Sequence, residues 1–171
     1  AGPAGSLAAR TAAQQGLDVL MIEKRQEIGE PVRCAEGVPV DGFYDFIEHD
    51  ERWVSAKIMG GRIHAPDGTV LNFSQFNEGP AGLVLDRKIF DRSLAKMAAD
   101  AGAEIHVKTR ATSLVREDGM IKGIKGISEG NEFEAHAKIT IGADGVESKI
   151  GRWAGLMAPL KLKDMETCAQ F

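Results

Sequence analysis

Glycines with the spacing of a phosphate-binding loop open the chain. Gly2-Pro3-Ala4-Gly5 leads directly into residues 6–15, an alanine-rich stretch that favours a helix ending at Gly16. Glycines let a backbone approach a pyrophosphate closely, and the first turn of a helix offers unpaired N–H groups and the positive end of its dipole. We therefore expect Gly2, Ala4 (through its backbone amide) and Gly5 to bind the phosphates of a nucleotide.

An acidic residue stands where the ribose of a nucleotide would be recognised. Residues 18–23 form an apolar run typical of a strand buried on both faces, and Glu23 ends it 21 residues after Gly2. A carboxylate there accepts hydrogen bonds from ribose hydroxyls, and acid rather than arginine favours FAD or NAD over NADP. This order predicts the second half of a β-α-β unit, whose first strand is expected before Ala1.

A second glycine turn follows a later apolar run. Ile141-Gly-Ala-Asp144-Gly145 ends a predicted strand and precedes a short helix predicted over 147–154. Taken alone, Asp144 and Gly145 either contact a cofactor or form an ordinary Asp-Gly turn. The helix after them favours the first interpretation.

An arginine opens the helix predicted over 86–101, which Asp86 would cap and Gly102 would stop. Arg87 in its first turn is either solvated or holds phosphate oxygens through charge-assisted hydrogen bonds. The apolar face of this helix is predicted to comprise Ile89, Phe90, Leu94, Met97, Ala98 and Ala101.

A polar loop, Pro31-Val-Arg-Cys34-Ala35-Glu-Gly37, lies within an extended segment predicted over 26–42. Cys34 invites a covalent or redox role, but no base at suitable spacing can be named, and Cys168 is distant in sequence. We expect neither a disulfide nor a covalent role for Cys34.

The combination of these motifs resembles a known family of flavoproteins. Pro3-Ala4-Gly5-Ser6 with Glu23-Lys24 resembles the FAD-binding start of the glutathione reductase and para-hydroxybenzoate hydroxylase type. The loop P-x-R-C-x-E-G closely resembles the geranylgeranyl reductase family, especially its archaeal digeranylgeranylglycerophospholipid reductases, and the likeness runs from residue 1 to about 156. It implies FAD as cofactor, with contacts from Cys34, Ala35, Gly37, Arg87, the backbone of Ala111 at the adenine, Asp144 and Gly145.

The resemblance also implies an activity. It is the FAD-dependent saturation of isoprenoid C=C bonds in geranylgeranyl chains, as in the biosynthesis of archaeal membrane ether phospholipids. The partners would be an isoprenoid lipid substrate and an electron donor, either NAD(P)H or ferredoxin, and no catalytic proton donor can be named. An FAD-dependent aromatic hydroxylase and a flavin electron carrier to a quinone are the alternatives.

The predicted fold class is α/β, a Rossmann-like FAD-binding domain with a parallel sheet and a small antiparallel β meander. Residues 57–64 and 69–73 are β-like and flank a turn at 65–68, and the meander is expected over 112–116, 120–127 and 132–141. We interpret 1–171 as a partial FAD-binding domain, because a later Gly-Asp-Ala motif and a substrate-binding part are missing from it. Its segments are 1–42 (phosphate loop, helix, ribose strand and flavin loop), 43–85 (an inserted β-rich segment) and 86–156 (helix, strands and Gly-Ala-Asp-Gly motif).

Charge and composition exclude several other functions. The net charge of −4 gives no basic face for nucleic acid, and His49, His64, His106 and His136 lack the spacing of metal ligands. With no apolar run of membrane-spanning length, we expect a cytoplasmic protein in peripheral contact with the membrane that holds its lipid.

Overall fold

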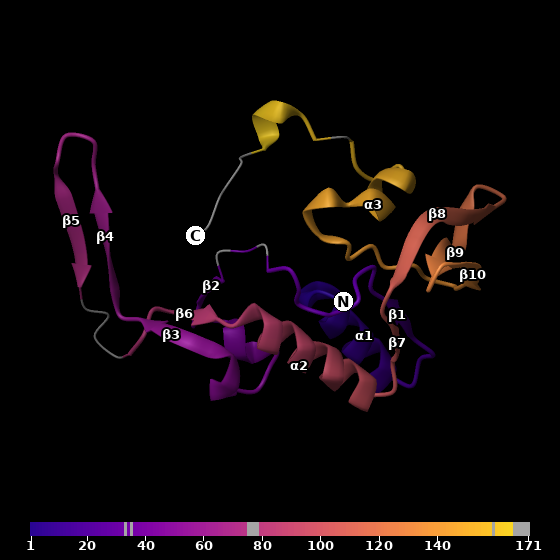
Figure 1. The fold of residues 1–171 in the computed structure, drawn as a ribbon, viewed down its shortest axis with the longest axis horizontal. Coiled ribbons are helices and arrows are strands. Elements are labelled where there is room, and N and C mark those ends of the chain that lie inside the picture. Colours follow the sequence, from indigo (N-terminus) through magenta and orange to yellow (C-terminus); the bar gives the residue numbers. More distant parts are fainter. Residues whose placement is uncertain (33, 35, 75–78, 159, 166–171) are drawn as a thin grey trace. The chain divides into compact units, whose positions relative to one another are not determined.

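The computed structural model describes residues 1–32, 34, 36–74, 79–158 and 160–165 (Figure 1). The chain forms two compact units, the first comprising Ala1–Glu30 with Asp91–Phe171 and the second Pro31–Phe90. The boundary between them falls inside helix α2 (Arg87–Asp100).

The first unit begins with helix α1 (Pro3–Gln14), as the alanine-rich composition predicted. The helix starts three residues earlier than expected, with Gly2 as N-cap and Pro3 in the first turn, because proline's fixed φ suits the first position of a helix. It ends before Gly16, whose φ of 77° is in the left-handed region that glycine adopts without strain.

Strand β1 (Leu20–Ile22) pairs in parallel with β7 (Glu104–His106), from Leu20 opposite Glu104 to Ile22 opposite His106. The prediction of a strand over 18–23 buried on both faces was wrong in length and in burial. Met21 is buried, but Leu20 is 42% exposed. The reason is that, among the residues that the structure describes, helices α1 and α2 pack on the Met21 face, and successive side chains of a strand point to opposite faces.

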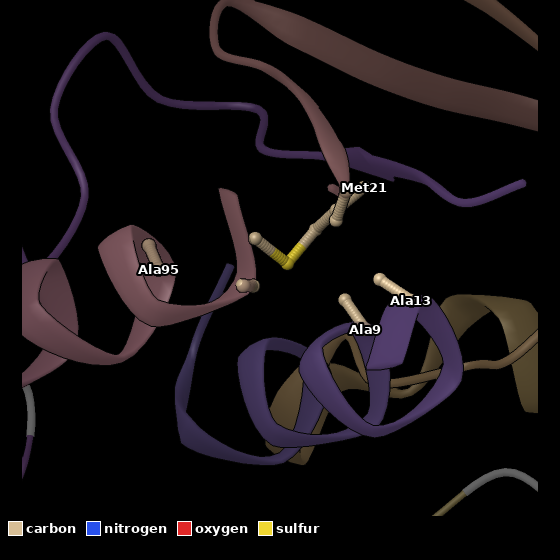
Figure 2. Packing of buried hydrophobic residues seen from close by; sticks show 6 residues of the cluster. Ala9, Ala13, Met21 and Ala95 are labelled. Carbon is tan, nitrogen blue, oxygen red and sulfur yellow. The ribbon is translucent and has the colours of Figure 1, made fainter. Parts of the chain in front are cut away.

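The core of the first unit is built mainly from small side chains. Figure 2 shows Met21 reaching toward Ala9 and Ala13 of α1 and toward Ala95 of α2. Ala98 and Ala103 complete this cluster of buried residues. Alanines let the helices approach the strand closely, and this packing holds the start of α1 beside the end of β1.

The predicted antiparallel meander is confirmed. Strands β8 (Thr109–Glu117), β9 (Met120–Ser128) and β10 (Asn131–His136) form a sheet in the order β10-β9-β8. The last strand was predicted to continue to residue 141, which is wrong. Ile139 and Ile141 lie outside the strand with 77% and 62% of their surface exposed, because the pairing with β9 ends at His136 opposite Gly123.

In the described part of the chain after the meander lie the short helices η3 (Gly145–Glu147), α3 (Lys149–Trp153) and η4 (Leu162–Asp164). The single helix predicted over 147–154 is therefore split. Ser148 separates η3 from α3 with a φ of 38°, a conformation outside the helical region.

The second unit contains a sheet and a hairpin. Strands β2 (Gly37–Pro39), β6 (Gly82–Leu85) and β3 (Val54–Ile58) form an antiparallel sheet in the order β2-β6-β3. The hairpin of β4 (Gly60–His64) and β5 (Val70–Ser74) closes through the predicted turn, where the Gly68 amide donates to the Ala65 carbonyl.

Two strand predictions in this unit were wrong. The strand predicted over 57–64 is divided at Met59, because its first residues pair with β6 and the remainder with β5. The segment over 26–42, predicted as an extended loop, contains β2, which forms because β6 supplies a partner remote in sequence.

Helix α2 begins as predicted, since Asp86 Oδ1 accepts a hydrogen bond from the Ile89 amide at 3.1 Å. Its predicted apolar face is wrong at Ile89, which is 39% exposed, whereas Ala95 is buried. In the second unit Phe90 packs edge-on against fully buried Trp53 with ring centroids 5.5 Å apart. The 3-10 turns η1 (Phe43–Asp45) and η2 (Glu51–Trp53) precede β3.

The described part of the chain has no helix with both the length and the apolar character needed to cross a membrane.

Enlarging the alanine core should destabilise the protein. Ala98 is fully buried, so Ala98→Leu forces extra methyl groups into packed space and should lower the free energy of unfolding by about 1–3 kcal/mol. Urea denaturation followed by circular dichroism measures the loss. Ala99→Leu, the same change at an exposed position of the same helix, is the control. Equal effects of the two substitutions would contradict the packing described above.

Candidate functional site

The N-terminus of α1 presents backbone donors to its surroundings. The first hydrogen bond of the helix runs from the Ser6 amide to the Gly2 carbonyl at 2.9 Å. The amides of Ala4 and Gly5 precede it and therefore have no partner within the helix. Ala4 is exposed, and the first turn has no acidic side chain. The amides of Ala4 and Gly5 and the positive end of the helix dipole are therefore suited to an anion.

The two glycine motifs of the first unit lie against each other. A Cβ atom on Gly5 would lie 3.4 Å from Cβ of Ala143, and one on Gly142 would lie 3.0 Å from Cγ2 of Ile150. Gly5 and Ala143 thus place the phosphate loop and the Gly-Ala-Asp-Gly turn in van der Waals contact, whereas Gly142 makes room for Ile150 of α3. The role of Ala143 was missed in the sequence, where the only signal was its small size directly after Gly142.

The Glu23 carboxylate lies beside the start of α1. Oε2 accepts a hydrogen bond from the Ala1 nitrogen at 2.9 Å, and Oε1 accepts one from the Arg25 amide, also at 2.9 Å. Burial raises the pKa of Glu23, whereas the hydrogen bond from the Arg25 amide and the positive charge of Arg25 lower it. The side chain is therefore an ionised acceptor at neutral pH, 17% exposed, at the carboxyl end of a parallel strand.

The backbone of Glu23 fixes the start of β8. Its amide donates to the His106 carbonyl at 2.8 Å, and its carbonyl accepts from the Thr109 amide at 2.8 Å. Thr109 is almost fully buried, and its hydroxyl lies 2.8 Å from that of Ser128. Ala111, paired with Gly126, therefore lies two residues beyond the contact with Glu23. Thr109 is a positioning residue that no sequence motif indicated.

Asp144 has a structural contact that the sequence did not suggest. Its Oδ2 accepts a hydrogen bond from the Ile150 amide at 3.0 Å and so caps the first turn of α3. The residue is exposed, and Oδ1 remains as an acceptor for another donor. Gly145 follows with a φ of 76° and starts η3, while Lys24 forms an ion pair with Glu147 at 3.3 Å.

The remaining predicted site residues belong to the second unit. Cys34 is exposed, and its Sγ accepts a long hydrogen bond of 3.5 Å from the Glu36 amide. Gly37 opens β2 opposite Val84, and Arg87 lies in the first turn of α2. Ala35 and Cys168 lie outside the described residues.

The structure thus divides the predicted site between the units. The first unit contains seven of the predicted residues, and the described part of the second contains three. Those of the first unit are Gly2, Ala4, Gly5, Glu23, Ala111, Asp144 and Gly145.

The first unit fits a dinucleotide such as FAD on its own features. Unpaired amides at the start of α1 suit a pyrophosphate, and the ionised Glu23 suits ribose hydroxyls. A Cβ atom added to Gly2 would have no described atom within 4 Å, so there is open space at the start of the helix. Within the ranges that the structure describes, no three His, Cys, Asp or Glu side chains gather to hold a metal ion.

The described fold and geometry are those of an α/β unit suited to a dinucleotide. A geranylgeranyl bacteriochlorophyll reductase-like protein from Thermoplasma acidophilum is similar in structure, with a TM-score of 0.84 and 42% identity over 91% of this chain and 40% of its own. A triple mutant of a flavin-dependent brominase has a TM-score of 0.71 over 91% of this chain and 39% of its own. At 20% identity, the brominase shares the fold alone.

The pattern of the FAD dependent oxidoreductase family matches residues 1–160, and this chain belongs to that family. The predicted cofactor, FAD, is thereby confirmed. A digeranylgeranylglycerophospholipid reductase from Methanocella arvoryzae is 62% identical over an alignment of 172 positions, which covers 100% of this chain and 44% of that protein. The chain therefore spans less than half the length of this relative.

Removing the Glu23 carboxylate should weaken FAD binding. An ionised acceptor of two ribose hydrogen bonds is worth about 1.5–3 kcal/mol, so Glu23→Ala should raise the Kd for FAD by about 10–100-fold. Fluorescence titration of the apoprotein with FAD measures the change. Glu132→Ala, at an exposed position on β10, is the control and should leave Kd unaltered. An unchanged Kd in Glu23→Ala would remove Glu23 from the site.

Arg87 provides a second test in the other unit. If its guanidinium holds cofactor oxygens, Arg87→Ala should weaken FAD binding by about tenfold, since charge-assisted hydrogen bonds are lost. The same titration measures it. Lys96→Ala is the control, because Lys96 lies on the same helix with its side chain 73% exposed in a surface ion pair of little energetic value. Equal Kd values in both variants would contradict a role for Arg87.

Proposed function

We propose that the protein carrying this chain is an FAD-dependent reductase that saturates C=C bonds in geranylgeranyl chains of archaeal membrane lipids. The observation that carries this proposal is the 62% identity, over the whole of this chain, with a digeranylgeranylglycerophospholipid reductase. The reductase-like structure from Thermoplasma acidophilum, at 42% identity, supports the same class of reaction.

FAD, when bound and reduced, supplies the hydride that saturation of an alkene requires. The first unit's share is to bind and orient the cofactor. The amides of Ala4 and Gly5 hold the pyrophosphate at the start of α1, and the Glu23 carboxylate accepts from the ribose. This assignment is supported by the unpaired amides of the helix start and by the position of Glu23 directly after β1, where its amide donates to the His106 carbonyl.

The other contacts follow the family resemblance. Ala111 meets the adenine through its backbone, and Asp144 and Gly145 lie toward the phosphate and ribose. Cys34, Ala35 and Gly37 follow the flavin, and Arg87 holds cofactor oxygens. Support for Ala111 comes from the hydrogen bond between Thr109 and Glu23, which brings the start of β8 to the ribose acceptor.

We also propose a larger arrangement around these contacts. The parallel pair β1–β7 is part of a Rossmann-like sheet, and residues 1–171 are part of one FAD-binding domain. Its segments are 1–42, 43–85 and 86–156, and the lipid-binding part lies outside the chain. The 44% share of the Methanocella arvoryzae relative that this chain covers supports the last point.

The proposed substrate sets the remaining partners. A digeranylgeranyl lipid resides in a membrane, so the protein works from the cytoplasm in peripheral contact with the membrane surface. The electron donor that reduces the flavin is NAD(P)H or ferredoxin.

Mass spectrometry tests the proposed reaction directly. The full-length holoenzyme, with its flavin reduced under anaerobic conditions, should convert a digeranylgeranylglycerophospholipid to products that gain mass in steps of two hydrogen atoms. The Glu132→Ala variant, altered at an exposed position away from the predicted site, should form the same products and serves as the control.

Two other results would overturn the proposal. Hydroxylation of a phenol with consumption of NAD(P)H and oxygen, without hydrogen addition to the lipid, would favour an aromatic hydroxylase. Rapid reoxidation of the flavin by a quinone without lipid turnover would favour an electron carrier.

A further inference from the structure

A compact turn over residues 24–30 follows the end of β1 and is held by the side chains of two arginines. Arg25 Nη1 donates to the Glu30 carbonyl at 3.0 Å, which closes the turn on itself. Arg92 of α2 donates from Nε to the Ile28 carbonyl at 3.2 Å, and partly buried Ile28 packs against the alanine cluster of the core. All of these residues belong to the first unit, so the turn is tied to the core that also supports α1.

Arg25 joins this turn to the carboxylate of Glu23. Its amide donates to Glu23 Oε1 at 2.9 Å, and its carbonyl accepts from the Lys108 amide at 2.9 Å. The amide, the carbonyl and the guanidinium of one residue are thus all engaged. A guanidinium presents its donors in a rigid planar fork, so it is well suited to hold the Glu30 carbonyl in a fixed place. Residue 25 therefore fixes both the turn and one oxygen of the acceptor before it.

The charge of Arg25 also acts on Glu23. A neighbouring cation favours the ionised form of a carboxyl group, and the positive charge and the amide of Arg25 both lower the pKa of Glu23, whereas burial raises it. The other charged groups on the elements around Glu23 are the Ala1 nitrogen, Lys24 paired with Glu147, Glu27 paired with Arg92, His106 paired with Glu104, Lys108, and Arg110 of β8.

We propose that Arg25 is a positioning residue of the FAD site, which aims the Glu23 carboxylate at the ribose and acts through that carboxylate rather than on the cofactor. This role rests on the proposed function, in which Glu23 accepts from ribose hydroxyls. A binding group that is already held in place loses less freedom when its ligand arrives, so the hold on Glu23 contributes to FAD affinity. An arginine that served the fold alone would leave the response of FAD affinity to pH and to loss of Glu23 unchanged.

Replacing the guanidinium tests this role in the full-length protein. Arg25→Met keeps a long side chain but removes its charge and its donors, and should raise the Kd for FAD at neutral pH by about three- to tenfold, as expected for one lost hydrogen bond. Fluorescence titration of the apoprotein measures the change. Arg25→Lys restores the charge and should recover part of the affinity. Arg62→Met, the same change at an exposed position of β4, is the control and should leave Kd unaltered.

The pH dependence of FAD affinity tests the charge of Arg25 separately. Without that charge the pKa of Glu23 should rise, so the carboxyl group becomes protonated at a higher pH and stops being an ionised acceptor. As the solution is acidified, FAD affinity should therefore begin to fall at a higher pH in Arg25→Met than in the wild type. Arg25→Lys should follow the wild-type profile. Identical profiles of Arg25→Met and the wild type would contradict the proposal.

A double-mutant cycle decides whether Arg25 acts through Glu23. Arg25→Met should weaken FAD binding in the wild-type background and have little further effect in Glu23→Ala, where no carboxylate is left to aim. Equal effects in both backgrounds would overturn the proposal, because Arg25 would then act on FAD directly or on folding. Unfolded apoproteins of both Arg25→Met and Arg25→Lys, detected by circular dichroism, would overturn it as well, since the arginine would then serve the fold alone.

The FAD titrations do not depend on lipid reduction, so they separate this role from the proposed reaction. If the enzyme reduces no digeranylgeranyl lipid but Arg25 and Glu23 are coupled in the cycle, the positioning role stands and the reaction fails. If the enzyme reduces the lipid and Glu23→Ala weakens FAD binding, but Arg25→Met has the same effect in both backgrounds, the reaction stands and the positioning role fails.

Discussion

The first unit depends on how strand β1 ends. Glu23 uses its amide, its carbonyl and Oε1 of its side chain at this point, which links β7, the start of β8 and its own turn. The backbone hydrogen bonds fix the direction of the side chain, so the carboxylate is placed by the sheet rather than by a flexible loop. A recognition group held in this way loses little conformational entropy when a ligand binds.

The site also requires segments of the backbone to approach each other closely. The glycines of the chain differ in what surrounds them. A Cβ on Gly142 would crowd the Ile150 side chain, whereas one on Gly5 would just touch Cβ of Ala143. Gly37 and Gly61 have open space instead. The first kind lets parts of the protein approach each other, and at the second kind no described atom lies near the place of a Cβ. Conservation of glycine would look the same in both cases, and only the surroundings tell them apart.

Signals between near neighbours in sequence predicted their elements well. The Asp86 cap, the turn over 65–68 and the alanine-rich helix after Gly5 all formed as expected, since each depends on residues a few positions apart. The errors arose where a distant partner decides the outcome. Whether Met59 breaks a strand, and whether residues 139–141 join one, depends on where β6 and β9 run out of pairing partners.

The same division applies to the site. Gly2, Ala4, Gly5 and Glu23 were predictable because loop, helix, strand and acid follow one another along the chain. Ala143 and Thr109 were not, since their roles depend on contacts with Gly5 and Glu23 that only the folded chain creates. The ion pair of Lys24 with Glu147 joins residues 123 positions apart for the same reason.

The buried cluster behind the phosphate loop limits which sequences can replace this one. Five of its six members are alanines, and the sixth is Met21. Among these residues, only Met21 has a side chain long enough for truncation to leave a sizeable cavity. Substitution of a buried alanine destabilises the protein in another way: a larger residue crowds the core, and glycine weakens a helix. Divergence in this region is thus confined to a few small residues, while the thioether of Met21, flexible and adaptable in shape, can absorb small shifts of the two helices.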